Sequence, residues 1–217
     1  KTLDGADLSE YEFEFELLEN DKVVSTAKND ASGNVVFSGI KYTEPGTHYY
    51  AAREVNGGIR GITYDKDIYK ITTEVKDNGD GTLSVEHSLS GDGELITFEN
   101  KYEITQGASV EIGASKILDG AELAEGQFTF ELLDENGKVI DTAVNDENGV
   151  ILFGEIKYKE PGTYKYKVRE VNDGQKGILY DEKVYGIVVN VRDVDSVLEV
   201  DIEADEMIFT NVLQKSE

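Results

Sequence analysis

The stretch Tyr164-Lys165-Tyr166-Lys167-Val168-Arg169-Glu170 alternates apolar and charged side chains up to its final glutamate. A period of two is typical of a β-strand with one face in a hydrophobic core and the other in water. Two further stretches share this period, with inward residues Tyr11, Phe13, Phe15 and Leu17 in one and Val110, Ile112 and Ala114 in the other. Turn sequences such as Asn148-Gly149 and Asp173-Gly174 punctuate the chain. Regularly spaced short strands with such turns predict an antiparallel β-sandwich.

The chain contains an internal repeat. Lys1-Thr2-Leu3-Asp4-Gly5-Ala6-Asp7-Leu8 returns as Lys116-Ile117-Leu118-Asp119-Gly120-Ala121-Glu122-Leu123. The Phe98-x-Asn100 motif near the end of the first copy returns as Phe209-x-Asn211. The same motifs in the same order indicate a tandem duplication. We therefore predict an all-β protein made of two tandem immunoglobulin-like β-sandwich domains, residues 1–103 and 104–217.

The composition excludes several classes of function. The 217 residues include 21 Lys and Arg against 45 Asp and Glu, for a net charge of −24. Such a field repels phosphate backbones and anionic lipid, so we expect no nucleic-acid partner. No apolar run approaches the roughly 18 residues that a membrane span needs, so we expect no membrane insertion in this segment. The chain has no Cys and only two His. This excludes disulfides and Cys nucleophiles and disfavours a zinc enzyme, so we expect no cofactor and no metal.

Three polar side chains in each repeat fall on the inward face of their strands. Period-two parity puts a lysine near the start, a glutamate in the middle and an asparagine near the end of each repeat on the core side. They are Lys116, Glu170 and Asn211 in the second repeat and Lys1, Glu54 and Asn100 in the first. Burying any one of them alone costs several kcal/mol. Because all three point inward twice, we expect each set to meet.

These motifs resemble those of a known family. The opening at Lys116–Leu123, the strand at Tyr164–Glu170 and the terminal Phe209-x-Asn211 look like the streptococcal pilin isopeptide-linkage domain. That family is related to the collagen-adhesin B-type repeats of Gram-positive surface proteins. The first repeat departs from the pattern, since His48 replaces the first Tyr and Ala52 the Val. The strand residues that precede Lys116 also have no counterpart in the first repeat, because the sequence begins at Lys1.

The resemblance implies a covalent bond between the first-strand Lys and the last-strand Asn, assisted by the buried Glu. By motif, the linked pairs are Lys1 with Asn100 and Lys116 with Asn211, and the catalytic residues are Glu54 and Glu170. The chemistry is reasonable, because an apolar site lowers the pKa of Lys and raises that of Glu. A neutral amine can then attack an amide that a protonated Glu polarises at its carbonyl oxygen. Each bond forms once, so the protein is not a turnover enzyme.

Each residue also has a simpler interpretation. The Lys can extend its ammonium into solvent, the Glu can form a buried ion pair with the Lys or with the neighbouring Arg53 or Arg169, and the Asn can cap a strand end. Asp77-Asn78-Gly79-Asp80-Gly81 superficially resembles a calcium loop, but its ligand spacing is wrong, so a hairpin turn is the better interpretation. A Thr–Gln ester bond is disfavoured, because the repeat equivalent of Gln214 is Glu103. A glycoside hydrolase rests on no specific pair of acids.

The resemblance implies structural stalk or spacer repeats of a Gram-positive cell-surface adhesin or pilin-like protein, located extracellularly and anchored to the cell wall. The expected partners are neighbouring repeats of the same chain, with a host ligand bound through other domains. No sortase signal follows Gln214, so we expect a segment of a longer array. The alternative is an adhesive module that itself binds a host protein or glycan. Its one indication is Tyr49, where the second repeat has Lys165.

Overall fold

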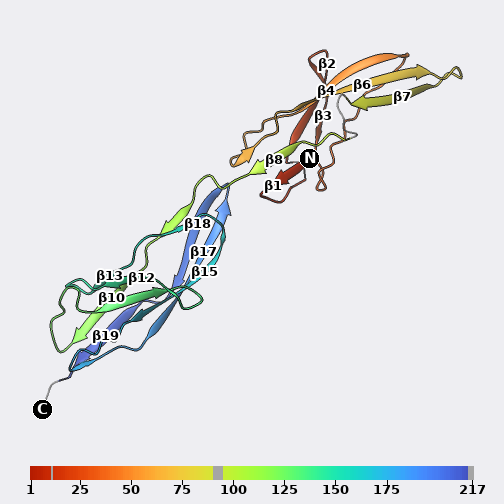
Figure 1. Ribbon diagram of the computed structural model, residues 1–217. Helices are drawn as coiled ribbons and strands as arrows, with labels where there is room; N and C mark the ends of the chain where they lie inside the picture. The colour runs from red at the N-terminus through yellow and green to blue at the C-terminus, as the bar shows by residue number, and fades with distance from the viewer. Residues whose placement is uncertain (11, 90–94, 215–217) are drawn as a thin grey trace. The chain divides into compact units, whose positions relative to one another are not determined.

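The structure is a computed structural model that describes residues 1–10, 12–89 and 95–214 (Figure 1). Tyr11, one of the expected inward residues, lies outside them. The described residues form strands and no helix, so the prediction of an all-β fold is confirmed. They contain no helix with the length and hydropathy of a membrane span. The chain divides into two compact units, Lys1–Glu103 and Ile104–Glu217.

The first unit consists of two sheets. Its strands are β1 (Thr2–Asp4), β2 (Glu14–Glu19), β3 (Lys22–Lys28), β4 (Gly46–Glu54), β5 (Ile62–Thr63), β6 (Ile68–Asp77), β7 (Leu83–Leu89) and β8 (Glu99–Tyr102). One sheet has the order β3-β2-β4-β6-β7 and is antiparallel throughout. The other has the order β1-β8-β5, in which β1 and β8 run parallel. Phe15 of β2 meets Phe98 between the sheets, with ring centroids 5.0 Å apart.

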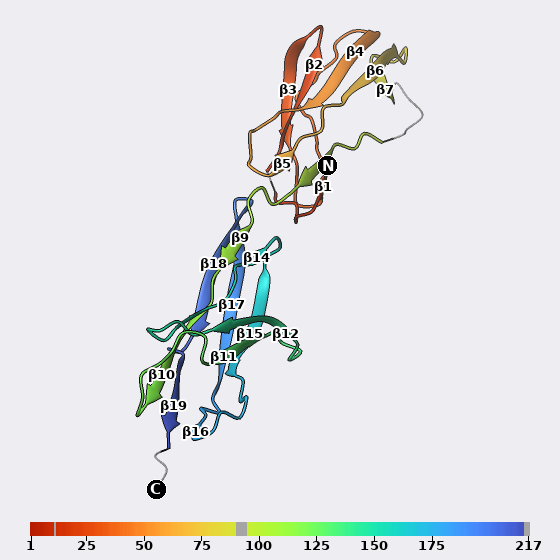
Figure 2. The same ribbon diagram turned by 60° about the vertical axis from the view of Figure 1, so that its left-hand side comes forward.

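The second unit repeats this plan with more strands (Figure 2). They are β9 (Ala108–Val110), β10 (Gly113–Asp119), β11 (Thr129–Leu133), β12 (Val139–Val144), β13 (Val150–Leu152), β14 (Ile156–Tyr158), β15 (Gly162–Glu170), β16 (Ile178–Leu179), β17 (Val184–Val194), β18 (Val197–Ala204) and β19 (Ile208–Leu213). The sheet orders are β12-β11-β15-β17-β18, β13-β10-β19-β16 and β14-β9. Residues of both large sheets form one core, in which Phe130 and Phe209 have ring centroids 5.1 Å apart.

Strand parity explains which side chains enter the cores. Phe13, Phe15 and Leu17 are buried, while the intervening glutamates remain exposed or half-buried. In the second unit Tyr166 and Val168 are buried and the adjacent lysines are exposed. Apolar burial of this kind provides most of the stabilisation of a sandwich. The expected continuous strand through residues 109–115 is instead two strands, because β9 pairs with β14 whereas the start of β10 pairs with β13.

Candidate functional site

In the second unit the lysine and the asparagine lie on the neighbouring parallel strands β10 and β19, and in the first unit Lys1 directly precedes β1, which runs parallel to the strand β8 that carries Asn100. Lys116 on β10 is in register with Phe209 on β19, and Leu118 is in register with Asn211. Side chains two residues apart along a strand share a face, so Lys116 and Asn211 both point to the core. Glu170 reaches the same place from the end of β15 in the facing sheet. The two sheets thus bring together side chains that are up to 95 positions apart in sequence.

One buried carboxylate contacts both nitrogens in the second repeat. Lys116 Nζ lies 2.8 Å from Glu170 Oε1 and also 2.8 Å from Oε2. Asn211 Nδ2 donates a hydrogen bond of 2.7 Å to the same Oε1. The Lys116 and Glu170 side chains have no solvent exposure, and Asn211 is equally buried. Glu170 therefore lies between the amine and the amide nitrogen, with water excluded from all three groups.

The first repeat has the same arrangement. Lys1 Nζ lies 2.9 Å from Glu54 Oε1 and 3.1 Å from Oε2. Asn100 Nδ2 donates to Glu54 Oε1 at 2.8 Å. The Lys1 and Glu54 side chains have no exposure, and Asn100 is buried. Thus the substitutions at His48 and Ala52 leave the geometry of this first set unchanged.

The surroundings favour the neutral forms of Lys1, Lys116 and Glu170. Burial lowers the pKa of Lys116 from its ordinary value, although the Glu170 carboxylate partly opposes this shift. Burial also raises the pKa of Glu170, and burial lowers the pKa of Lys1. Aromatic rings form the apolar wall, with Phe128 centred 4.5 Å from Lys116 Nζ and Phe13 centred 4.5 Å from Lys1 Nζ. A lysine with a lowered pKa holds more of its nucleophilic, neutral amine.

The carbonyl oxygen of each asparagine is bound by the backbone, which sequence reasoning missed. The Asp181 N–H donates to Asn211 Oδ1 at 2.8 Å, and the Asp65 N–H donates to Asn100 Oδ1 at 2.8 Å. The expected hydrogen bond from Glu to this oxygen is therefore wrong, because the amide turns its NH2 to the carboxylate. The Asp181 carboxylate in turn accepts from the Thr210 N–H at 2.9 Å. The sequence signal for this contact was the Tyr64-Asp65 pair, which recurs as Tyr180-Asp181.

A glycine packs against the backbone of each buried lysine. The Lys116 N–H donates to the Gly149 carbonyl at 2.7 Å, and Gly149 has φ of +83°. A Cβ built at Gly149 would overlap the Lys116 carbonyl oxygen. Gly33 has the same relation to Lys1, with φ of +82°. A side chain at either glycine would therefore displace the strand that carries the lysine.

We predict that Gly149→Ala destabilises the second repeat by about 3 kcal/mol, since positive φ and a backbone overlap add together. Calorimetric unfolding of the full chain measures the loss. The matched control is Gly126→Ala, because Gly126 also has positive φ (+70°) but open space around its Cβ position. We expect Gly126→Ala to destabilise the second repeat by about 1 kcal/mol, from the positive φ alone. Equal losses in the two variants would contradict the close approach at Lys116.

Other candidates from the sequence do not form sites. Residues 77–81 make the hairpin turn between β6 and β7, as expected, with the Asn78 N–H bonded to the Thr82 carbonyl at 3.1 Å. Within residues 1–10, 12–89 and 95–214, no group of three or more His, Cys, Asp or Glu side chains could hold a metal ion. Tyr49 is 69 % exposed. A single exposed aromatic side chain does not define a binding surface.

The fold and the site together define a class, namely tandem β-sandwiches that each bury a Lys–Glu–Asn set between their two facing sheets. The chain matches the model of the Spy0128-like isopeptide containing domain, FctA, over residues 1–103 and again over residues 112–214. It therefore belongs to this family and holds two copies of the domain. The family resemblance inferred from the three motifs is thus confirmed. No match was found among curated proteins.

Several solved structures are similar to the whole chain. The major pilin from Streptococcus pyogenes is 14% identical, with 98% of this chain and 96% of that chain covered and a TM-score of 0.35. The major pilin protein T-13 from Streptococcus pyogenes is 15% identical, with 94% and 89% covered and a TM-score of 0.32. A C-terminal fragment of the pilus adhesin SpaC from Lactobacillus rhamnosus GG is 14% identical, with 98% and 94% covered and a TM-score of 0.30. At this level of similarity, no residue role is transferred from these proteins.

Proposed function

We propose that each repeat forms an intramolecular isopeptide bond, between Lys1 and Asn100 in the first and between Lys116 and Asn211 in the second. The observation that carries the proposal is the contact of one buried carboxylate with both reacting nitrogens, present twice in a chain of the isopeptide containing family. Burying a Lys and a Glu costs several kcal/mol of desolvation for each ion. The presence of the same buried set in both repeats therefore supports a function for it.

The geometry suggests a role for each group in the reaction. The neutral Nζ of Lys116 attacks Cγ of Asn211, which forms the new C–N bond and puts negative charge on Oδ1. The Asp181 N–H, already bonded to Oδ1, stabilises that charge as an oxyanion-hole donor does. Glu170 accepts a proton from Nζ and delivers one to Nδ2, since its carboxyl contacts both nitrogens. The C–Nδ2 bond then breaks and one ammonia leaves.

Proximity replaces an external enzyme in this mechanism. The folded sandwich holds amine, acid and amide in one water-free site, where effective molarities can reach about 10⁵ M or more. The reaction consumes the lysine amine and the asparagine amide, so each domain reacts once. Accordingly, the proposed role is structural and not that of a turnover enzyme.

We further propose that the chain is a stalk or spacer segment of a Gram-positive cell-surface protein, adhesin or pilin-like. Membership of the isopeptide containing family supports this role. So does the strand arrangement, because Lys1 directly precedes β1 and Lys116 lies on β10, and each of these strands pairs parallel with the last strand of its repeat, which carries the asparagine. A covalent bond between these two positions transmits a pulling force directly from one to the other, so the remaining strands of the sandwich bear no load. Tandem copies with a strongly acidic surface suit a spacer.

Peptide mapping tests the bonds directly. After trypsin digestion of the denatured chain, we expect a branched peptide that joins the Lys116 segment to the Asn211 segment and a second that joins Lys1 to Asn100. Each should be about 17 Da lighter than its two linear parts, since one ammonia is lost. The Asn211→Ala chain is the control and should keep only the Lys1–Asn100 branch. Recovery of linear peptides alone from the unmodified chain would contradict the proposal.

A further inference from the structure

A short strand beside each asparagine ends two residues before an aspartate. In the second repeat β16 pairs antiparallel with β19, and Leu179 is in register with Val212. Two residues further along the same register, Asp181 lies opposite Thr210, which directly precedes Asn211. Backbone pairing has stopped by this point, since β16 ends at Leu179. Side chains therefore take part in the hydrogen bonds between the two segments here.

Asp181 replaces the missing backbone pairing with hydrogen bonds that run in opposite directions. Its N–H donates to Asn211 Oδ1 at 2.8 Å. Its Oδ2 accepts the N–H of Thr210 at 2.9 Å. The other carboxylate oxygen, Oδ1, accepts the N–H of Lys183 at 2.9 Å, which fixes the turn that follows the aspartate. One residue is thus bonded both to the asparagine amide and to the strand that carries it.

The first repeat contains the same three hydrogen bonds. The Asp65 N–H donates to Asn100 Oδ1 at 2.8 Å. Its Oδ2 accepts the N–H of Glu99 at 2.8 Å, and its Oδ1 accepts the N–H of Asp67 at 2.8 Å. The donors to the carboxylate carry different side chains in the two repeats, whereas the aspartate is the same in both. The arrangement therefore depends on the aspartate and on backbone groups.

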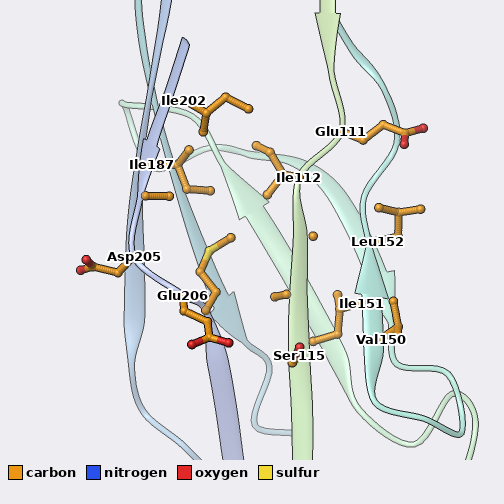
Figure 3. A pocket seen from close by; sticks show the side chains of 14 residues that line it. Glu111, Ile112, Ser115, Val150, Ile151, Leu152, Ile187, Ile202, Asp205 and Glu206 are labelled. Carbon is orange, nitrogen blue, oxygen red and sulfur yellow. The ribbon is translucent and has the colours of Figure 1, made fainter.

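The asparagine oxygen in the second repeat is shielded from solvent. Asn211 is fully buried. A hollow of about 390 Å³ lies beside β10, and Figure 3 shows Ser115 and Ile151 at its wall. Neither Lys116 nor Asn211 is among the residues that line this hollow. Water in the hollow is therefore kept from the asparagine oxygen, whose donor remains the Asp181 N–H.

The charge of Asp181 does not by itself favour the reaction. Burial opposes ionisation of this carboxyl, which is 8 % exposed, but the N–H groups of Thr210 and Lys183 lower its pKa and keep it ionised. Burial lowers the pKa of Lys116, and the negative charge of Asp181 opposes that shift. Burial raises the pKa of Glu170, and the same charge adds to that shift. The charge thus disfavours the neutral amine while it favours the neutral acid.

We propose that Asp181 and Asp65 are positioning residues for isopeptide bond formation, whose carboxylates hold a backbone N–H on the asparagine oxygen. This inference rests on the proposed bonds. The carboxylate ties residues 181–183 to β19, so the N–H stays directed at Asn211 Oδ1 while the carbonyl carbon is attacked. The same hydrogen bond fixes the amide plane and keeps Nδ2 turned to Glu170. Without the carboxylate, the N–H remains in the chain but can move away from the oxygen.

The rate of bond formation in the Asp181→Ala chain tests this role. The full chain is made by cell-free synthesis, synthesis is stopped, and samples are denatured at intervals and digested with trypsin. We expect the branched peptide of the second repeat to form at least about tenfold more slowly than in the unmodified chain, since a small misplacement can cost about 100-fold. The branched peptide of the first repeat should form at the unmodified rate in the same molecules. Asp65→Ala should reverse the two results.

Asp134→Ala is the matched control in the same repeat. The Asp134 carboxylate also accepts two backbone N–H groups, from Asn136 and Lys138 at 2.9 Å each, but it lies in the turn between β11 and β12. Its loss should leave both rates unchanged. An Asp181→Ala chain that forms the second-repeat branch at the unmodified rate would overturn this inference and leave the proposed bond standing. Absence of both branches from the unmodified chain would overturn the two together.

Amide hydrogen exchange separates positioning from general support of the fold. The comparison uses chains kept unlinked by Lys116→Met, so that bond formation does not affect the result. There we expect Asp181→Ala to speed exchange at the N–H of residue 181 by about tenfold or more and to leave exchange in the central strand β15 unchanged. Loss of protection across the second repeat would overturn the proposal, because Asp181 would then support the fold as a whole.

Discussion

Replacing Glu170 by Ala is expected to abolish the bond in the second repeat and to lower the melting temperature of that repeat by about 20 °C or more. The substitution removes the carboxyl that contacts both Lys116 Nζ and Asn211 Nδ2. A link that closes a loop of about 100 residues contributes roughly 4.7 kcal/mol on the chain-entropy model. For a domain of this size, each kcal/mol corresponds to about 4 °C or more in melting temperature. Calorimetry and intact mass on the same sample measure both effects.

Two controls separate the chemistry from general damage to the fold. Glu170→Gln keeps the shape of the side chain but cannot move protons, so it should also remain unlinked. Glu131→Ala removes a surface ion pair with Arg169 on the adjoining strands and should cost at most about 1 kcal/mol. Its mass should match that of the linked protein. A Glu170→Ala chain that still shows the bonded mass would exclude Glu170 as the proton carrier.

Replacing Asn211 by Ala is expected to change how the second repeat responds to force. In the linked protein, tension that enters at Lys116 leaves at Asn211 through the side-chain bond, so the residues between them are never stretched. Without the bond, unfolding should release about 320 Å of additional contour length, since an extended chain spans about 3.4 Å per residue. Single-molecule stretching of the full chain between its two ends measures this length directly.

The control for stretching is Asn136→Ala, which changes an exposed asparagine in the β11–β12 turn. That variant should show no unfolding step, like the unmodified chain. The Asn211→Ala chain should show one step, and the chain with Asn100→Ala as well should show two. A step of about 320 Å from the unmodified chain would mean that the second repeat is not locked and does not act as a tension-bearing spacer.

Strand parity was sufficient to identify the buried lysine, glutamate and asparagine of the second repeat. Side chains on a strand have a period of two. The alternation along Tyr164–Glu170 therefore predicts that Glu170 is buried, and the position of Lys116 two residues after Ala114 predicts the same for the lysine. Parity could not predict that the Asp181 N–H would bind the asparagine oxygen, because that contact depends on a loop that returns to β19. The close approach of Gly149 to Lys116 likewise joins segments distant in sequence.

The two repeats also show why similar sequences do not always form the same strands. Ile40–Tyr42 and Ile156–Tyr158 both read Ile-Lys-Tyr, yet only the latter is a strand. The difference is the presence of β9, which supplies backbone partners to β14. Strand formation needs a neighbour as well as a suitable sequence.

The intact mass of the purified, denatured chain tests the central claim most directly. Each isopeptide bond releases one ammonia, so two bonds predict a mass about 34 Da below that of the sequence. The Lys116→Met chain should lose only about 17 Da, from the first repeat alone. A chain that has the full mass of its sequence would contradict the account, because the buried Lys–Glu–Asn sets would then be ion pairs and not sites of bond formation.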